Sequence, residues 1–238
     1  MEFLSGELIR ELLAPVPRPM IESKAELIFL DGQYLFHYRE GKQEHYKLLS
    51  PASVRQAFSN EPIDSGWIPF GVVRWGIAAR GEWVVMFVHP KAHKLDFGSN
   101  ETLTVALPSF IFLGVGKYYY IWAITGETFD PGSTAFHAPL PNVRPGGDIC
   151  FGSNIPPTAS CQTIAQAWDL FIQSEFNGDL ANGKSKSQPN DVREKLRSIA
   201  KQRSRKYPVK DLQTYRSRIV DLVETVISRG SLVVYEPR

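Results

Sequence analysis

Cys150 and Asn142 are the two side chains of this 238-residue chain whose types and spacing best suit covalent chemistry. They lie eight residues apart in a segment rich in proline and glycine, HAPLPNVRPGGDICFGS, which runs from His137 to Ser153. A thiolate is a nucleophile, and the oxyanion that forms when it attacks a carbonyl needs a nearby hydrogen-bond donor. An asparagine amide is such a donor, and a chain that turns back at the Pro-Gly-Gly tripeptide would bring it beside the thiol.

Each of these residues also has a purely structural interpretation. Cys150 follows Ile149 and would serve as a small buried hydrophobic residue. Asn142 follows a proline and would form an Asx turn. The second cysteine, Cys161, precedes a predicted helix, and we expect it to fill space in the packing. Ser153 is a further hydroxyl close to Cys150 and a weaker alternative acyl acceptor.

The segment lies between β-rich and helical parts of the chain. Three β-favouring runs precede it, at 82–90, 101–116 and 117–125, and predict an antiparallel meander to about Thr125. A helix follows it, because Ile164, Trp168, Phe171 and Ile172 recur at helical spacing. Strands followed by helices are typical of the α+β class. We therefore expect a core at 61–180, between an N-terminal extension at 1–60 and a basic helical part at 181–238.

The sequences of the N-terminal extension and of the basic C-terminal part also predict secondary structure. In the N-terminal extension we expect a short helix over 1–13, a hairpin over 26–39 that turns at Asp31-Gly32, and a helix over 50–59. In the C-terminal part we expect a helix from about Asp191 and a longer amphipathic helix over 208–229. Gly230 would cap that second helix, and 231–236 would form a closing strand.

The charge is unevenly distributed. The net charge is +2, but 184–218 holds twelve Lys or Arg against three acids, which gives +9 there and −7 elsewhere. A solvated helix face is the ordinary reason for such a run. A docking face for an acidic partner is the alternative, carried by Lys201, Arg203, Arg205 and Lys206. We do not expect a nucleic acid as partner.

The sequence lacks the motifs that are typical of several classes of protein. The apolar runs are far shorter than the ~20 residues that span a bilayer, and the N-terminus has no basic region typical of a signal peptide. We therefore expect a cytoplasmic protein with free thiols and no membrane partner. His89 and His93 imitate metal-ligand spacing, but two histidines without a third ligand make a weak site, and we expect no metal. All five histidines precede Cys150, so the papain-like order of cysteine before histidine is absent.

The segment around Cys150 resembles the active site of ubiquitin-conjugating enzymes. In that family a His-Pro-Asn tripeptide precedes the catalytic cysteine at the same Asn-to-Cys spacing, and here the tripeptide is Leu140-Pro141-Asn142. The blocks SGWIPFGVVRWG, ALPSFIFLGVGKYYYIWAI, FHAPLPNV and ICFGS are similar to prokaryotic family D of that superfamily, which includes the PRTRC system protein B group. The likeness covers roughly residues 60–180.

The resemblance implies a ubiquitin-conjugating-like α+β fold and an acyl carrier. Cys150 would accept the C-terminal acyl group of a ubiquitin-like protein from an activating enzyme, and Asn142 would stabilise the oxyanion or brace the loop. No cofactor is implied, because ATP is used upstream. The implied partners are a ubiquitin-like protein, an activating-type enzyme and a JAB-type peptidase from the same operon.

One position departs from the family pattern, because Leu140 stands where the tripeptide has histidine. His137, three residues earlier, is the candidate to replace it. The alternative function is a non-catalytic scaffold of the same fold that binds the ubiquitin-like protein or the activating enzyme. A third hypothesis, a DNA-associated protein that uses the basic helices, is weaker.

Overall fold

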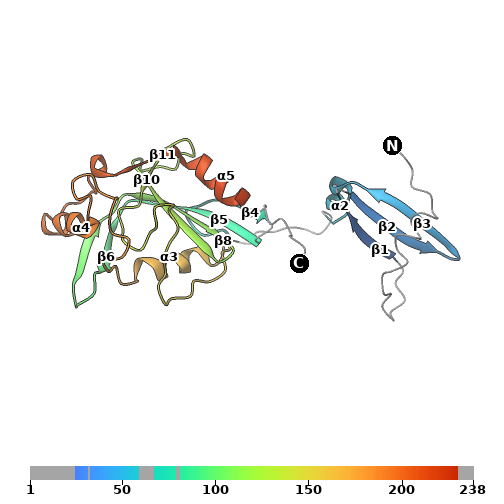
Figure 1. The fold of residues 1–238 in the computed structure, drawn as a ribbon, viewed down its shortest axis with the longest axis horizontal. Coiled ribbons are helices and arrows are strands. Elements are labelled where there is room, and N and C mark those ends of the chain that lie inside the picture. Colours follow the sequence, from blue (N-terminus) through green and yellow to red (C-terminus); the bar gives the residue numbers. More distant parts are fainter. Residues whose placement is uncertain (1–24, 32, 59–66, 79–80, 230–238) are drawn as a thin grey trace. The chain divides into compact units, whose positions relative to one another are not determined.

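A computed structural model describes residues 25–31, 33–58, 67–78 and 81–229 (Figure 1). The chain divides into two compact units, Met1–Asp64 and Ser65–Arg238. The helix that we expect over 1–13, the cap at Gly230 and the strand over 231–236 lie outside the described residues. None of the described helices is long and apolar enough to cross a membrane.

The described residues of the first unit form a three-stranded antiparallel sheet and one helix. Strands β1 (Ala25–Leu30) and β2 (Gln33–Glu40) form the predicted hairpin, with Leu30 opposite Gln33 on either side of the turn. A third strand that we did not predict, β3 (Gln43–Leu49), pairs with β2. Helix α2 (Pro51–Phe58) confirms the short helix, and the Ser50 hydroxyl accepts the Ser53 backbone N–H at 3.1 Å, as an N-cap does.

The second unit is built on a six-stranded antiparallel sheet in the order β11-β10-β9-β8-β5-β4. Its strands are β4 (Val72–Ala78), β5 (Gly81–Val88), β8 (Ser109–Val115), β9 (Tyr118–Ile124), β10 (Thr134–His137) and β11 (Thr214–Arg218). The predicted β-run 101–116 divides at Pro108: its first part, β7 (Thr102–Ala106), leaves the large sheet and pairs with β6 (Ala92–Asp96) in a separate ribbon. Mostly antiparallel sheets with few helices confirm the α+β class.

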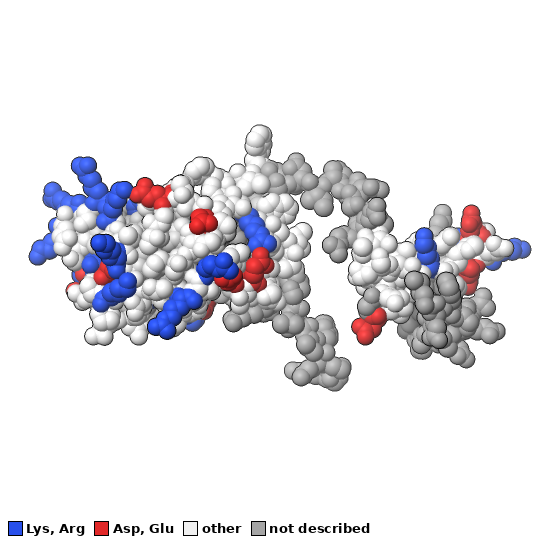
Figure 2. Space-filling view, turned by 90° about the horizontal axis from the view of Figure 1, so that it is seen from above, with Lys and Arg blue, Asp and Glu red and all other residues white. Residues whose placement is uncertain are grey.

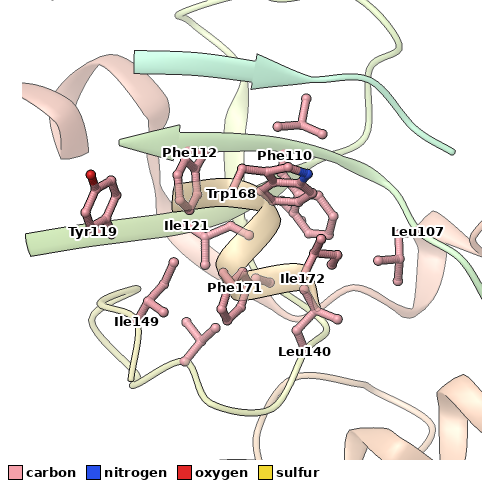
Figure 3. Close-up of a cluster of buried hydrophobic side chains, with 14 of the residues drawn as sticks. Leu107, Phe110, Phe112, Tyr119, Ile121, Leu140, Ile149, Trp168, Phe171 and Ile172 are labelled. Atoms are coloured by element: carbon pink, nitrogen blue, oxygen red, sulfur yellow. The ribbon is translucent and has the colours of Figure 1, made fainter. Parts of the chain in front are cut away.

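Both faces of the sheet are covered, which explains why every residue of β8 is buried. Helix α3 (Ile164–Ile172) lies on one face, and α5 (Ile219–Arg229) lies on the other (Figure 1). Trp168 and Phe171 of α3 pack with Phe110, Phe112 and Ile121 of the central strands (Figure 3). Alternate residues of the same strands, Ile111, Leu113 and Trp122, pack on the opposite face with Ile219 and Val223 of α5.

The predicted helix over 208–229 is wrong in its first half. Val209–Asp211 forms a single 3₁₀ turn, Thr214–Arg218 forms the edge strand β11, and only Ile219–Arg229 is helical. The apolar residues of this stretch do recur at helical spacing, but strand β10 offers an open edge, and pairing with it outweighs that local pattern. The expected helix from about Asp191 is confirmed by α4 (Val192–Lys201), whose N-cap is Asp191: the Asp191 carboxylate accepts the Arg193 N–H.

His93 in β6 makes the stability of this unit depend on pH. Its ring is buried with an edge contact to Trp168, and burial, helped by the charge of Lys91, lowers its pKa to about 4. The unfolded chain binds a proton near pH 6.5 and the folded chain only near pH 4, so the free energy of unfolding falls as the pH drops between these values. The expected loss is up to about 3 kcal/mol.

Denaturant unfolding at pH 7 and pH 4.5 measures this loss. The variant His93→Phe should show a smaller pH dependence than the wild type, whereas His89→Phe should not, because His89 is exposed. An unchanged pH dependence in His93→Phe would assign the effect to other groups.

Candidate functional site

Asn142 and Cys150 face each other across a small hairpin. The Cys150 N–H donates to the Asn142 carbonyl at 2.8 Å, and Val143 forms an antiparallel bridge with Ile149. The turn is closed by the Arg144 N–H, which donates to the Asp148 carbonyl at 2.8 Å. The chain therefore does turn back at Pro-Gly-Gly, and its backbone brings the two candidate residues side by side.

The hairpin is fastened to strand β9. The Ile121 N–H donates to the Gly147 carbonyl at 2.8 Å, and the Ile149 N–H donates to the Tyr119 carbonyl at 2.9 Å. Gly147 has a φ of +91°, and its α-carbon lies directly against the indole of Trp122, with no room for a β-carbon. Both the backbone angle and the close approach require glycine here.

The neighbours of Cys150 hold it at the surface. Ile149 belongs to the buried cluster beneath the hairpin, where it lies near Tyr119 (Figure 3). The ring of Phe151 makes edge contacts with Tyr119 and Phe171, at centroid distances of 5.7 and 6.2 Å. Cys150 lies between these two anchored residues and is partly exposed. The residue is therefore held in place yet is not sealed in the core, as an accessible nucleophile requires.

Asn142 has the contacts of a residue that braces a loop. Its φ is +59°, a left-handed conformation that asparagine tolerates better than most residues. Its side-chain amide donates to the Glu175 carbonyl at 2.8 Å, and its backbone N–H donates to the Asp179 carbonyl at 3.1 Å. An amide NH₂ carries two hydrogens, so this bond leaves Asn142 with donor capacity for a second acceptor.

His137 and Leu140 each make contacts with residues other than Cys150 and Asn142. Leu140 is fully buried and packs into the core near Phe171 (Figure 3). The ring of His137 packs against Tyr215 at a centroid distance of 4.9 Å. Burial, together with the charge of Lys184, lowers the pKa of His137. Within the described part of the chain, His137 makes no hydrogen bond to Cys150 or Asn142.

Two residues beneath the hairpin had no signal in the sequence. Glu175, which accepts the Asn142 amide, uses only its backbone carbonyl, and any residue type carries one. Lys184 donates from Nζ to the carbonyls of Leu140 and Val143, but in the sequence it is one of twelve basic residues in a polar stretch. Its burial depends on contacts with residues more than 40 positions away.

Cys161 lies in a different environment from Cys150. It is 2% exposed, and its N–H donates to the Glu82 carboxylate at 3.0 Å. Burial, with the charge of Glu82 nearby, raises the pKa of the Cys161 thiol. A buried thiol with a raised pKa is a poor nucleophile.

The four basic residues singled out as a docking face are all exposed. Lys201 and Arg203 border one open depression, together with Arg197 and Glu101. Arg205 and Lys206 border another, and Lys206 forms an ion pair with Glu127 at 2.6 Å. Basic side chains gather at the end of the unit where α4 lies (Figure 2).

Comparison with known proteins gives one match. The family model described as prokaryotic E2 family D matches residues 45–215, which is more than half of the chain and includes the hairpin with Asn142 and Cys150. Searches of curated proteins and of solved structures gave no match.

Proposed function

Since the chain belongs to prokaryotic E2 family D, we propose that it is a carrier enzyme that accepts the C-terminal acyl group of a ubiquitin-like protein on Cys150. Membership of the family implies a role related to ubiquitin-like conjugation, with a ubiquitin-like protein or an activating enzyme as partner. The observation that carries the catalytic proposal is the hairpin: a partly exposed cysteine, with anchored neighbours on both sides, directly opposite an asparagine.

The proposed reaction has two balanced transfers. The Cys150 thiolate attacks the thioester carbonyl of the activating enzyme's adduct, a C–S bond to Cys150 forms, and the activating enzyme's sulfur leaves as a thiolate. An acceptor amine or hydroxyl then attacks the new thioester, Cys150 leaves as a thiolate, and the acceptor's proton passes to solvent. As written, neither transfer uses a nucleotide or a metal.

Asn142 acts in this proposal at both tetrahedral intermediates. One hydrogen of its amide is bonded to the Glu175 carbonyl, which fixes the plane of the amide, and the other donates to the oxyanion. His137 has a lesser role, as a packing residue for Tyr215 beneath the hairpin. The basic residues Lys201, Arg203, Arg205 and Lys206 offer a docking face for an acidic partner. A JAB-type peptidase from the same operon and a cytoplasmic location complete the proposal.

A non-catalytic scaffold is the second candidate, and one observation favours it. The position of the family's histidine holds Leu140, and that side chain is fully buried in the core. A protein that had lost transfer but kept the fold would tolerate such a change, and it would still bind the ubiquitin-like protein or the activating enzyme.

Incubation with the activating enzyme and ubiquitin-like protein of the same operon, and ATP, separates the two candidates. The carrier is expected to form a covalent adduct that disappears on treatment with a thiol reductant. A complex that forms on a sizing column without any such adduct would support the scaffold and contradict the carrier.

Replacement of Asn142 tests the oxyanion role. Asn142→Gly keeps a residue suited to the left-handed backbone but removes the amide and its bond to the Glu175 carbonyl, so it should still fold and should slow transfer by about 100-fold. Asn142→Ala should slow transfer equally and also lower stability by about 1 kcal/mol. Single-turnover rates of adduct formation and of discharge to free lysine measure the effect.

Asn154→Ala is the matched control, because Asn154 lies four residues beyond Cys150 and is exposed. It should transfer at the wild-type rate. If Asn142→Gly also does so, the amide is not the oxyanion donor.

A further inference from the structure

Lys184 has a buried side-chain amine that contacts the loop of the candidate site. Its side chain is 3% exposed, and Nζ donates to the Leu140 carbonyl at 2.6 Å and to the Val143 carbonyl at 2.7 Å. These two carbonyls lie on either side of Pro141-Asn142. A single amine therefore bridges the backbone before and after the asparagine that faces Cys150.

The composition of the loop explains why a side chain makes these bonds. Pro139 and Pro141 have no backbone N–H, so the loop contains few donors for its own carbonyls. Buried carbonyls without partners are costly, and an amine with several hydrogens can serve two at once. Burial lowers the pKa of Lys184 to about 7, but a neutral amine still carries two hydrogens, so both bonds form in either protonation state.

The segment that carries Lys184 is itself held firmly. Ser185 forms a bridge with Leu212, and its hydroxyl donates to the Asp211 carboxylate at 2.5 Å. The Ser187 N–H donates to the same carboxylate at 2.9 Å. Burial acts to raise the pKa of Asp211, but these hydrogen bonds outweigh it and hold the pKa below its usual range. A buried, ionised carboxylate thus holds the residues that directly follow Lys184.

We infer that Lys184 is a positioning residue of the candidate site: it holds the Leu140–Val143 backbone so that Asn142 stands opposite Cys150. The link to the thiol is direct, because the Asn142 carbonyl accepts the Cys150 N–H. Leu140 keeps its side chain in the core while its carbonyl is bonded by Lys184, so the loop is fixed without a polar side chain at position 140. The effect on acyl transfer rests on the proposed function, whereas the effect on the loop does not.

Hydrogen exchange tests the positioning without any partner protein. In Lys184→Met, which keeps the length of the side chain but has no donor, the Cys150 and Asn142 amides should exchange at least about tenfold faster, and amides of β8 should not change. Lys186→Met is the matched control, two residues away and exposed, and should exchange like the wild type. Equal acceleration of all amides, or none at Cys150, would overturn the inference.

Two further measurements keep the test decisive. Cys161 is buried, so its resistance to iodoacetamide reports that the variant is folded. If Lys184→Met does not fold, Lys184→Gln and Lys184→Ala are compared instead. The glutamine amide is shorter than the lysine side chain but still has two donor hydrogens, so the Cys150 amide should exchange more slowly in Lys184→Gln than in Lys184→Ala. Ordering of the two variants the other way would contradict the inference.

With the partner proteins present, Lys184→Met should form the adduct at least about tenfold more slowly, while iodoacetamide should alkylate Cys150 within about twofold of the wild-type rate. Alkylation needs the thiol but not the oxyanion donor. A slower adduct formation with an unchanged alkylation rate would therefore show that positioning is lost and that access to the thiol is kept. If the wild type forms no adduct, the proposed function fails and the exchange experiment still decides the role of Lys184. A wild-type transfer rate in Lys184→Met would overturn the inference that Lys184 contributes to acyl transfer.

Discussion

Cys150→Ala is expected to abolish the covalent adduct with the ubiquitin-like protein, because it removes the acyl acceptor. Cys150→Ser is expected to replace the thioester by an oxygen ester, which resists thiol reductants and is cleaved by base. The serine adduct should form slowly, since an alcohol with an ordinary pKa is a weaker nucleophile than a thiol. Gel mobility with and without reductant, and then after mild alkali, distinguishes a thioester, an oxygen ester and the absence of an adduct.

Cys161→Ala is the internal control for this series. Cys161 is the other cysteine of the chain, and its side chain is buried against the sheet, away from solvent. The variant should form the reductant-sensitive adduct at the wild-type rate, apart from a modest loss of stability. Persistence of the adduct in Cys150→Ala, or its loss in Cys161→Ala alone, would contradict the assignment of Cys150 as acceptor.

Gly147→Ala is expected to destabilise the hairpin by about 2–4 kcal/mol. Part of the cost is the positive φ, about 1–2 kcal/mol for a residue with a β-carbon. The rest is overpacking, because the β-carbon would overlap the indole of Trp122, which is buried and held by β9. The hairpin must then either move away from β9 or displace the indole, and either change shifts Cys150.

Gly152→Ala is a matched comparison, because Gly152 also has a positive φ, +61°, but no atom lies within 4 Å of the position that a β-carbon would take there. It should cost only about 1 kcal/mol. Denaturant unfolding measures both variants, and exchange of the Ile121 N–H, which donates to Gly147, reports whether the hairpin detaches locally. Equal costs for the two variants would show that the approach to Trp122 does not matter.

Local features of the fold were predictable because each depends on residues close in sequence. The hairpin of β1 and β2 follows from alternating β-favouring residues around Asp-Gly, and α3 follows from four apolar residues at helical spacing. The start of α4 follows from the capping side chain of Asp191. The approach of Asn142 to Cys150 belongs to the same class, since a Pro-Gly-Gly turn between residues eight positions apart can bring them side by side.

The secondary-structure predictions are wrong where pairing with a strand far away in the sequence determines the conformation. The stretch before α5 has a helical pattern, yet the open edge of β10 makes 214–218 a strand, about 80 positions from its partner in sequence. The run 101–116 reads as one β-segment, yet β7 pairs with β6 and only β8 enters the large sheet. The local sequence pattern limits which conformations are favourable, and hydrogen bonding to a neighbouring strand determines which of them forms.

For the candidate site, the sequence by itself indicated the candidate thiol, the asparagine and the turn that joins them, because all three lie within a few residues. The tertiary structure alone decided what surrounds them. It buried Leu140, placed the Glu175 carbonyl on the Asn142 amide, and brought Lys184 under the loop from more than 40 residues away. Burial of a lysine is unfavourable unless acceptors are already in place, and only the folded chain supplies them.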